Sequence, residues 1–379
     1  MIEKVSKALC CGCRACESAC PKSAIRFEKD ANGFSYPQAT DACISCGKCL
    51  KVCPVNTQTE PQDKSEIKVY ALQNKASEIL SESSSGGVFF ELASYIIQNG
   101  GVVFGAAFDE NLKLSHVAAE TTEELKPLMG SKYLQSDIRS ALKQVKETLV
   151  SGRLVLYSGT PCQIKALHRY LGKAYENLYT VDVICHGAPS QAHFDRYVQY
   201  IEKKYHSRIK SISFRNKSNG WKNFCVKLCL ENGKVIIEDI HKNLYMRAFL
   251  KNLSLRESCF QCSANNYRSG SDLTMGDFWN IERTSATFSD DRGCSGVMIH
   301  SEKGQKLLEA VKNRFVCEEQ SLELLVKYNH VLETSVKKPA NYDAFAKAYF
   351  TLDLNKTDDM YLCGSFTERL KKRLWKILK

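Results

Sequence analysis

The sequence lacks several features that often mark a function. No apolar run reaches the ~18 residues that a membrane-spanning helix needs, and residues 1–9 hold no apolar stretch of the kind found in secretory signals. No catalytic triad, Walker motif or G-x-G-x-x-G sequence stands out, and the eight histidines show no metal-binding spacing. We therefore expect a cytoplasmic protein whose chemistry depends on other residues.

The cysteines are numerous but are not arranged as a disulfide framework. Nine of the 18 lie within residues 1–53, and the others are scattered through the rest of the 379-residue chain. A chain of this length should hold more than one domain. Scattered cysteines in a long chain favour a reducing compartment over a disulfide-built secreted protein.

Two runs of the form C-x2-C-x2-C-x3-C-P fill the first 54 residues. Three thiolates at intervals of three suit one iron–sulfur cube, whereas the cysteine before each proline ligates the other cube. Zinc sites usually pair two C-x2-C hooks and have no need of the further thiols, so we disfavour zinc. Cys11 fits no position and is expected to be a small residue beside a cluster. The pattern predicts one 4Fe-4S cluster on Cys10, Cys13, Cys16 and Cys53, and a second on Cys43, Cys46, Cys49 and Cys20.

The remaining sequence predicts an α+β protein: a small ferredoxin-like two-cluster domain followed by a larger mixed α/β domain. Predicted strands alternate with predicted helices, which indicates a partly parallel sheet covered by helices. The strands lie at 67–72, 102–108, 154–157 and 178–184, and the helices at 86–98, 136–150, 162–171 and 190–204. Antiparallel strands are expected at 209–215, 225–230 and 235–240. The predicted domains are 1–57, a linker at 58–66, 67–345, and a C-terminal segment at 346–379.

Two strand-to-helix turns are candidate ligand sites. Residues 83–87, SSSGG, could hold a flavin diphosphate at a helix N-terminus, although a plain helix entry is the commoner explanation of such a turn. In the second turn Cys162 begins a helix, where the helix dipole favours a thiolate. Cys185 follows the next strand, so both cysteines should reach the same edge of a parallel sheet.

Further residues in this region have more than one interpretation. With Cys259 and Cys262, the two cysteines make four, which could ligate a third 4Fe-4S cluster, hold a structural zinc or be buried as small apolar residues. Asp277, beside Phe278 and Trp279, could line a substrate pocket or end a strand. His186 could donate a proton or be structural. Strand or core positions account for Cys225, Cys229, Cys294, Cys317 and Cys363.

The net charge of +11 is partly local, because residues 366–379 carry six basic residues against Glu368. Apolar residues recur there every four positions, which predicts a basic amphipathic helix. Such a helix could lie on an anionic membrane, on a partner or on its own protein. We do not expect a nucleic-acid partner.

Several blocks in order resemble the family of coenzyme F420 hydrogenase/dehydrogenase beta subunits. They are the twin cysteine motif, SSSGGVFFELASYIIQNGGVVFGAAFD, MGSKYLQSD, SGTPCQIKALHRYL, DVICHGAPS, SCFQC and LTMGDFWN, spanning residues 1 to about 300. The resemblance implies an iron–sulfur flavoprotein with FAD in the body. It also implies a third cluster on Cys162, Cys185, Cys259 and Cys262. The implied flavin contacts are Ser84, Ser85, Gly86, Gly87, Ser131, Lys132, Tyr133, Thr160 and Gln163.

The expected function is therefore a flavin-dependent oxidoreductase that passes electrons between a ferredoxin-type donor, the clusters and FAD. Its small-molecule substrate is not identified, and the ligands do not set the direction of electron flow. His186 and Asp277 are the candidates for catalysis. The alternatives are an electron-transfer subunit of a larger complex, a coenzyme F420 oxidoreductase, and a zinc-stabilised binding module with a ferredoxin head.

Overall fold

The N-terminal part of the chain forms a small head that carries both cysteine runs. The structure is a computed structural model that describes residues 2–57 and 59–363. In the head, strands β1 (Ile25–Lys29) and β2 (Ser35–Ala39) form an antiparallel hairpin between two short helices, α1 (Ala15–Ser18) and α2 (Lys48–Lys51). Short 3-10 turns, η1 (Ile2–Lys4) and η2 (Pro54–Asn56), flank them. Each short helix contains the third cysteine of one run, Cys16 or Cys49.

The body is built on one eight-stranded sheet in the order β13-β3-β12-β11-β7-β6-β4-β5. Strands β4, β6, β7 and β11 are parallel, and the other four pair antiparallel at the two sides. The bounds are β3 (Lys68–Asn74), β4 (Val102–Phe108), β5 (Leu114–Ala119), β6 (Val155–Gly159), β7 (Leu178–Val183), β11 (Leu273–Asp277), β12 (Ser295–Ile299) and β13 (Phe315–Gln320).

Helices cover both faces of this sheet because its strands are apolar on both sides. In β6, Leu156 packs into one core, and Val155 and Tyr157 pack into another. The first core includes α4 (Val88–Gln98) and α9 (Glu302–Val311), and the second includes α5 (Arg139–Val150) and α6 (Pro161–Leu171). The helices α3 (Ser77–Glu82) and α10 (Leu322–Tyr328) lie near the β3 side.

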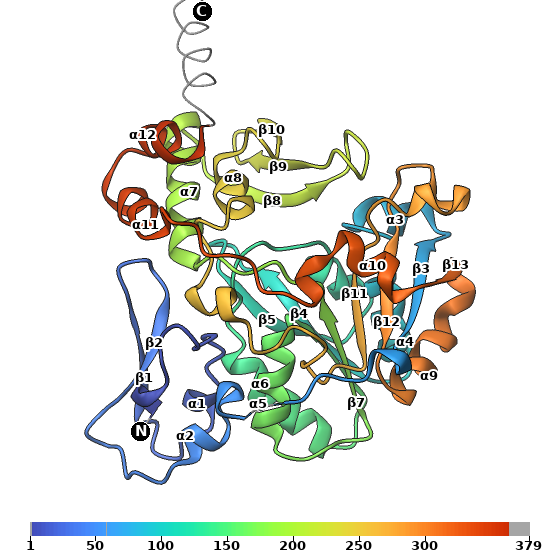
Figure 1. Cartoon of the computed structure of the whole chain (residues 1–379), viewed down its shortest axis with the longest axis horizontal. Helices are drawn as coiled ribbons and strands as arrows, with labels where there is room; N and C mark the ends of the chain where they lie inside the picture. Colours follow the sequence, from blue (N-terminus) through green and yellow to red (C-terminus); the bar gives the residue numbers. More distant parts are fainter. Residues whose placement is uncertain (1, 58, 364–379) are drawn as a thin grey trace, which may run out of the picture.

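A second, three-stranded antiparallel sheet lies on the far side of the body from the head (Figure 1). Its strands are β8 (Ile209–Asn216), β9 (Cys225–Leu230) and β10 (Val235–Asp239). They pack with α7 (Gln191–Tyr205) and α8 (Leu244–Leu250) around a core rich in aromatic side chains. Helices α11 (Tyr342–Thr351) and α12 (Leu354–Thr357), followed by the π-helical turn Asp358–Leu362, cover α7 and α8.

The head packs directly on helices α5 and α6. Ala15 of the head is fully buried in the core that these helices form. Arg169 of α6 donates a 2.6 Å hydrogen bond to the carbonyl oxygen of Lys51, and Ser18 donates one to the carbonyl oxygen of Arg139. The head is therefore joined to the body by a buried apolar contact and by hydrogen bonds from side chains to backbone carbonyl oxygens.

The α+β fold class is confirmed, and the predicted strands and helices between residues 67 and 240 are found within a few residues of their expected ends. The sequence reasoning missed β5 and β13, which form the two edges of the sheet, and β12, which lies between β3 and β11. The alternative that Asp277 ends a strand is confirmed by β11. The predicted domain bounds stay predictions, and the basic helix at 366–379 lies outside the described residues. Within the described part of the chain, no helix has the length and apolar character needed to cross a membrane.

Candidate redox site

Most of the head's run cysteines lie in two groups that are compatible with crossed ligation. Cys20 lines a cavity of about 210 Å³ together with Cys43, Cys46 and Cys49 of the other run. Cys53 lies beside Cys16 and Cys10. Burial, and then the charges of Cys10 and Cys53, raise the pKa of the Cys16 thiol. Cys20 thus lies with the first three cysteines of the other run, and Cys53 lies with two of the first three, Cys10 and Cys16.

In the body, four cysteines from distant parts of the chain meet around one cavity of about 80 Å³. Cys162 lies in the first turn of α6, and Cys185 lies two residues beyond the end of β7. Cys259 and Cys262 lie on and just after a 3-10 turn, η5 (Glu257–Gln261). The four predicted ligands of the third site are therefore brought together. Cys11 of the head, for which the sequence indicated no role, lines the same cavity.

Two buried cations lie beside these thiols. Lys165 and Arg256 are only 5% and 2% exposed, respectively. The Lys165 amine donates to the carbonyl oxygen of Ser263, next to Cys262. Burial raises the pKa of Cys259 to about 12 and also raises that of Cys185, so these thiols keep their protons when no metal is bound. A metal group would displace those protons, and the two cations would offset the charge of an anionic cluster.

The spacing of the cysteines bears on which metal group fits. A single tetrahedral zinc holds its sulfurs about 2.3 Å away, which places them roughly 3.8 Å from one another. Across residues 2–57 and 59–363, only Asp358, Asp359 and Cys363 form a group of three or more ligand atoms within 4.8 Å of one another. The cysteine groups are thus wider than a zinc site, and they fit a larger cluster better.

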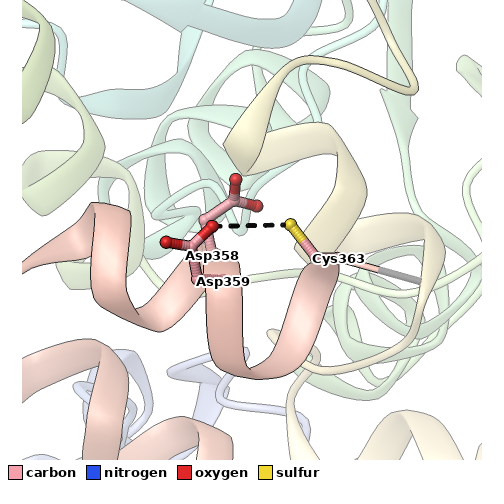
Figure 2. A group of neighbouring side chains, drawn as sticks. All are labelled: Asp358, Asp359 and Cys363. Atoms are coloured by element: carbon pink, nitrogen blue, oxygen red, sulfur yellow. Dashed lines mark hydrogen bonds between the residues drawn. The ribbon is translucent and has the colours of Figure 1, made fainter. Parts of the chain in front are cut away.

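The group of Asp358, Asp359 and Cys363 is shown in Figure 2. Asp358 forms an ion pair with Arg247, which already compensates its charge. The Cys363 thiol lies 3.7 Å from a carboxylate oxygen of Asp359 and makes a weak hydrogen bond to it. These contacts account for the group as packing at the end of α12, and we assign it no metal.

A larger cavity of about 450 Å³ lies at the carboxyl edge of the parallel strands. The residues implied as flavin contacts line it, with the exception of Gly86. Both catalytic candidates, His186 and Asp277, also line it. A Cβ atom on Gly86 would stand 2.1 Å from the Leu72 carbonyl oxygen, so this glycine lets the turn pack against the sheet. The lining residues implied as flavin contacts are Ser84, Ser85, Gly87, Ser131, Lys132, Tyr133, Thr160 and Gln163.

One wall of this cavity is a buried polar network that the sequence reasoning missed. His116 Nε2 lies 2.8 Å from the Ser158 carbonyl oxygen and donates to it, so Nδ1 accepts from the Ser136 hydroxyl. Burial lowers the pKa of His116 to about 4, which keeps the ring neutral. Gln163 donates to the Ser136 hydroxyl, and its oxygen accepts from the Thr160 amide. His116 carries no local sequence signal, because its partners come from other strands and loops.

The opposite wall carries charge. Arg215, on β8, binds both carboxylate oxygens of Asp277 and donates to the Ser84 carbonyl oxygen. The Trp221 ring nitrogen also donates to Asp277. Asp277 is therefore held as an ion-paired carboxylate, a poor arrangement for a free proton acceptor. His186 Nε2 is hydrogen-bonded to the Asn252 side chain.

Lys132 is a second basic residue at this cavity, and its side chain is half-buried. Its amine donates to the carbonyl oxygens of Pro127, Leu128 and Met129, at 2.7–2.9 Å. Burial lowers its pKa to about 7. Lys132 can therefore gain or lose its proton near neutral pH.

The two cavities share a wall. Cys185, His186 and Gln163 line both the cysteine cavity and the larger one. The order from the head inward is the first cysteine run, Cys11, the four-cysteine group, and then the larger cavity. This arrangement of cysteine groups is that of an iron–sulfur electron-transfer protein.

Comparison with known families then identifies the chain further. Residues 9–57 match the 4Fe-4S dicluster domain, and residues 152–324 match the C terminus of the coenzyme F420 hydrogenase/dehydrogenase beta subunit. Residues 152–324 are thus a domain of the kind found in these beta subunits, and residues 9–57 are a dicluster ferredoxin domain.

Individual relatives are distant. The chain is 26% identical to a subunit of the F420H2 dehydrogenase of Methanosarcina mazei over 175 residues, covering 43% of this chain and 49% of that relative. It is 24% identical to an uncharacterized protein of Methanocaldococcus jannaschii over 351 residues, or 83% and 90% of the two chains. The chain spans half or less of the length of two of the curated relatives that it matches.

One solved structure is also similar. A chain of the F420-reducing NiFe hydrogenase complex from Methanosarcina barkeri aligns with a TM-score of 0.48 and 20% identity, covering 73% of this chain and 90% of that one.

Proposed function

We propose that the protein is an iron–sulfur flavoprotein oxidoreductase. In this proposal the head carries two 4Fe-4S clusters, the four-cysteine group carries a third, and the larger cavity holds FAD. A ferredoxin-type protein exchanges electrons with the head, and a small molecule is reduced or oxidised at the flavin. The observation that carries the proposal is the shared wall, because Cys185 lines both the cysteine cavity and the larger one.

The cofactors proposed here would divide the chemistry. Bound clusters carry single electrons, and a bound flavin pairs them for an organic substrate. The protein residues supply binding and charge. Lys132 suits an anionic group, and Ser84, whose hydroxyl accepts from the Ser131 amide, joins two loops that line the cavity. The neutral network of His116, Ser136 and Gln163 offers hydrogen-bonding groups without a net charge.

The test is a count of cofactors after oxygen-free purification. We expect about twelve irons per chain and one extractable FAD. Cys259→Ala should lose about four irons, whereas Cys317→Ala, outside the three cysteine groups, should lose none. Iron-free, colourless protein would contradict the proposal, and a loss of zinc instead of iron in Cys259→Ala would contradict the third cluster.

A second candidate is an electron-transfer subunit whose partner performs the chemistry. The relative in Methanosarcina mazei is named as a subunit, which favours this alternative, and F420 itself is then a candidate substrate of the complex. Purified protein distinguishes the two: turnover of an electron acceptor by the isolated chain would exclude a subunit without activity of its own.

A further inference from the structure

Cys11 lies at the boundary between the head and the body. It lines the four-cysteine cavity together with Cys162, which lies in the first turn of helix α6 of the body. In the sequence it stands between Cys10 and Cys13, two proposed ligands of the first head cluster. A side chain outside the twelve proposed ligands therefore lies between the two cluster sites.

Two side chains of the body, the buried Arg256 and the half-buried Gln135, hold the loop that carries Cys11. The Arg256 guanidinium donates to the carbonyl oxygens of Cys10, at 2.6 Å, and Ser35, at 2.8 Å, and to the side-chain oxygen of Gln135. The Gln135 amide donates to the carbonyl oxygens of Cys11 and Gly12, at 2.9 and 3.1 Å. Arg256 therefore holds the backbone just before Cys11, and Gln135 holds the backbone at Cys11 and just after it.

Gly12 allows this close approach. Its φ of +68° is in the left-handed region, and a Cβ atom there would stand 2.6 Å from Arg256 Nη1. Only glycine fits the loop against the guanidinium without displacing it.

The charge of Arg256 points to an anion at the same place. Its side chain is buried, and within the described residues it forms no ion pair with a carboxylate. Nη2 lies 3.8 Å from the sulfur of Cys10. A buried cation is costly unless it is compensated, and a cluster on Cys10 would supply the negative charge.

We propose that Cys11 is the contact through which electrons pass between the first head cluster and the four-cysteine site, and that Arg256 and Gln135 hold it in place. This inference rests on the proposed function, since both sites must carry clusters. One electron moves between the sites, and no bond forms or breaks. A thiol at position 11 can donate a hydrogen bond to a neighbouring cluster sulfur, and such hydrogen bonds stabilise added negative charge on a cluster.

The experiment compares the full-length wild type with Cys11→Ala, Cys11→Ser and a matched control, Cys229→Ser, prepared without oxygen. Cys229 lies on β9 in the small sheet, far from the head in Figure 1. Each protein is titrated with dithionite while the electron paramagnetic resonance of the reduced clusters is recorded. Rapid freeze-quenching then follows how quickly the signal of the four-cysteine site appears.

We expect every variant to keep its iron. Cys11→Ala should lower the midpoint potential of the cluster signals, because it removes a donor to sulfur, and Cys11→Ser should restore it. The signal of the body site should appear about tenfold more slowly in Cys11→Ala, as for other residues that support metal ligands. Arg256→Lys keeps a positive charge but loses the fork of hydrogen bonds, so it should keep its iron and slow the exchange.

Three results would overturn the inference. Loss of about four irons in Cys11→Ala would make Cys11 a ligand. Potentials and rates equal to those of Cys229→Ser would make it a packing residue. Rates in Arg256→Lys equal to wild type would remove the positioning role, even if Cys11→Ala fails to fold. A wild type with only about eight irons would instead refute the third cluster, a failure visible before any variant is compared.

Discussion

At the scale of single residues, the site depends on polar groups that the fold buries and then pairs. The Arg215–Asp277 ion pair shows this most clearly, because Arg215 is only 4% exposed in its side chain and the carboxylate accepts from two of its nitrogens and from Trp221. Breaking such a pair leaves one buried charge uncompensated. We therefore interpret Asp277 as a charged wall of the cavity more than as a catalytic base.

Asp182 is a buried carboxyl group at the end of β7 that we expect to set part of the pH dependence of stability. Burial raises its pKa from 3.8 to about 6, against the opposing hydrogen bonds of Ser269, Thr274 and Ser271. The folded state therefore binds more protons than the unfolded state between these values. The stabilising contribution is complete below pH ~4 and is lost as the pH rises through about 6.

The prediction is that Asp182→Asn removes this dependence and stabilises the protein at pH 7. Two pKa units correspond to up to about 3 kcal/mol, and the amide keeps the volume of the carboxyl group. The measurement is oxygen-free thermal unfolding from pH 4 to pH 8, with exposed Asp41→Asn as the control. If both variants follow the wild-type curve, Asp182 is not the group responsible.

At the scale of elements, the start of helix α6 joins the two cavities. Thr160 precedes the helix, Pro161 and Cys162 form its first residues, and Gln163 turns back to accept from the Thr160 amide. The same Gln163 reaches the Ser136 hydroxyl and lines both cavities. One helical turn therefore presents a proposed cluster ligand on one side and a proposed flavin contact on the other.

Gln163→Leu should weaken this element. Gln163 is 6% exposed, so its loss leaves the Thr160 amide and the Ser136 hydroxyl with one partner fewer, at a cost of about 1–3 kcal/mol. We expect a lower midpoint in urea unfolding and less bound FAD per chain. Gln144→Leu on the exposed face of α5 is the matched control. Full FAD content together with unchanged stability in Gln163→Leu would contradict this role.

At the scale of the whole molecule, the head is a unit only if its two runs exchange their last cysteines. Cys20 shares a cavity with Cys43, Cys46 and Cys49, although 23 to 29 residues separate them in the sequence. A cluster bound there would tie the two halves of the head together.

Cys20→Ala should therefore release the second cluster and leave the first. We expect a loss of about four irons and new alkylation of Cys43, Cys46 and Cys49 by iodoacetamide, detected by mass spectrometry of the peptides. Cys225→Ala, a buried strand cysteine, is the control. Alkylation of Cys10, Cys13 and Cys16 in the Cys20→Ala variant would show that the ligation is not crossed.

The sequence by itself determined the parts of this protein that depend on short spacing. The cysteine runs and the alternation of strands and helices are local patterns, and the structure has the predicted strands and helices with small shifts at their ends. Residues 162 and 185 could be placed at one sheet edge because both follow parallel strands. That inference needs only the order of the elements.

Tertiary structure alone decided the contacts between distant segments. Strands β12 and β13 carried no clear local signal, and the pairing of β11 between β7 and β12 brings Asp277 to the larger cavity. Cys11 showed no function in the sequence, because Cys162 and Arg256 are far from it along the chain. A side chain's role in such a site depends on which surfaces the folded chain packs together, and no spacing of neighbouring residues encodes that.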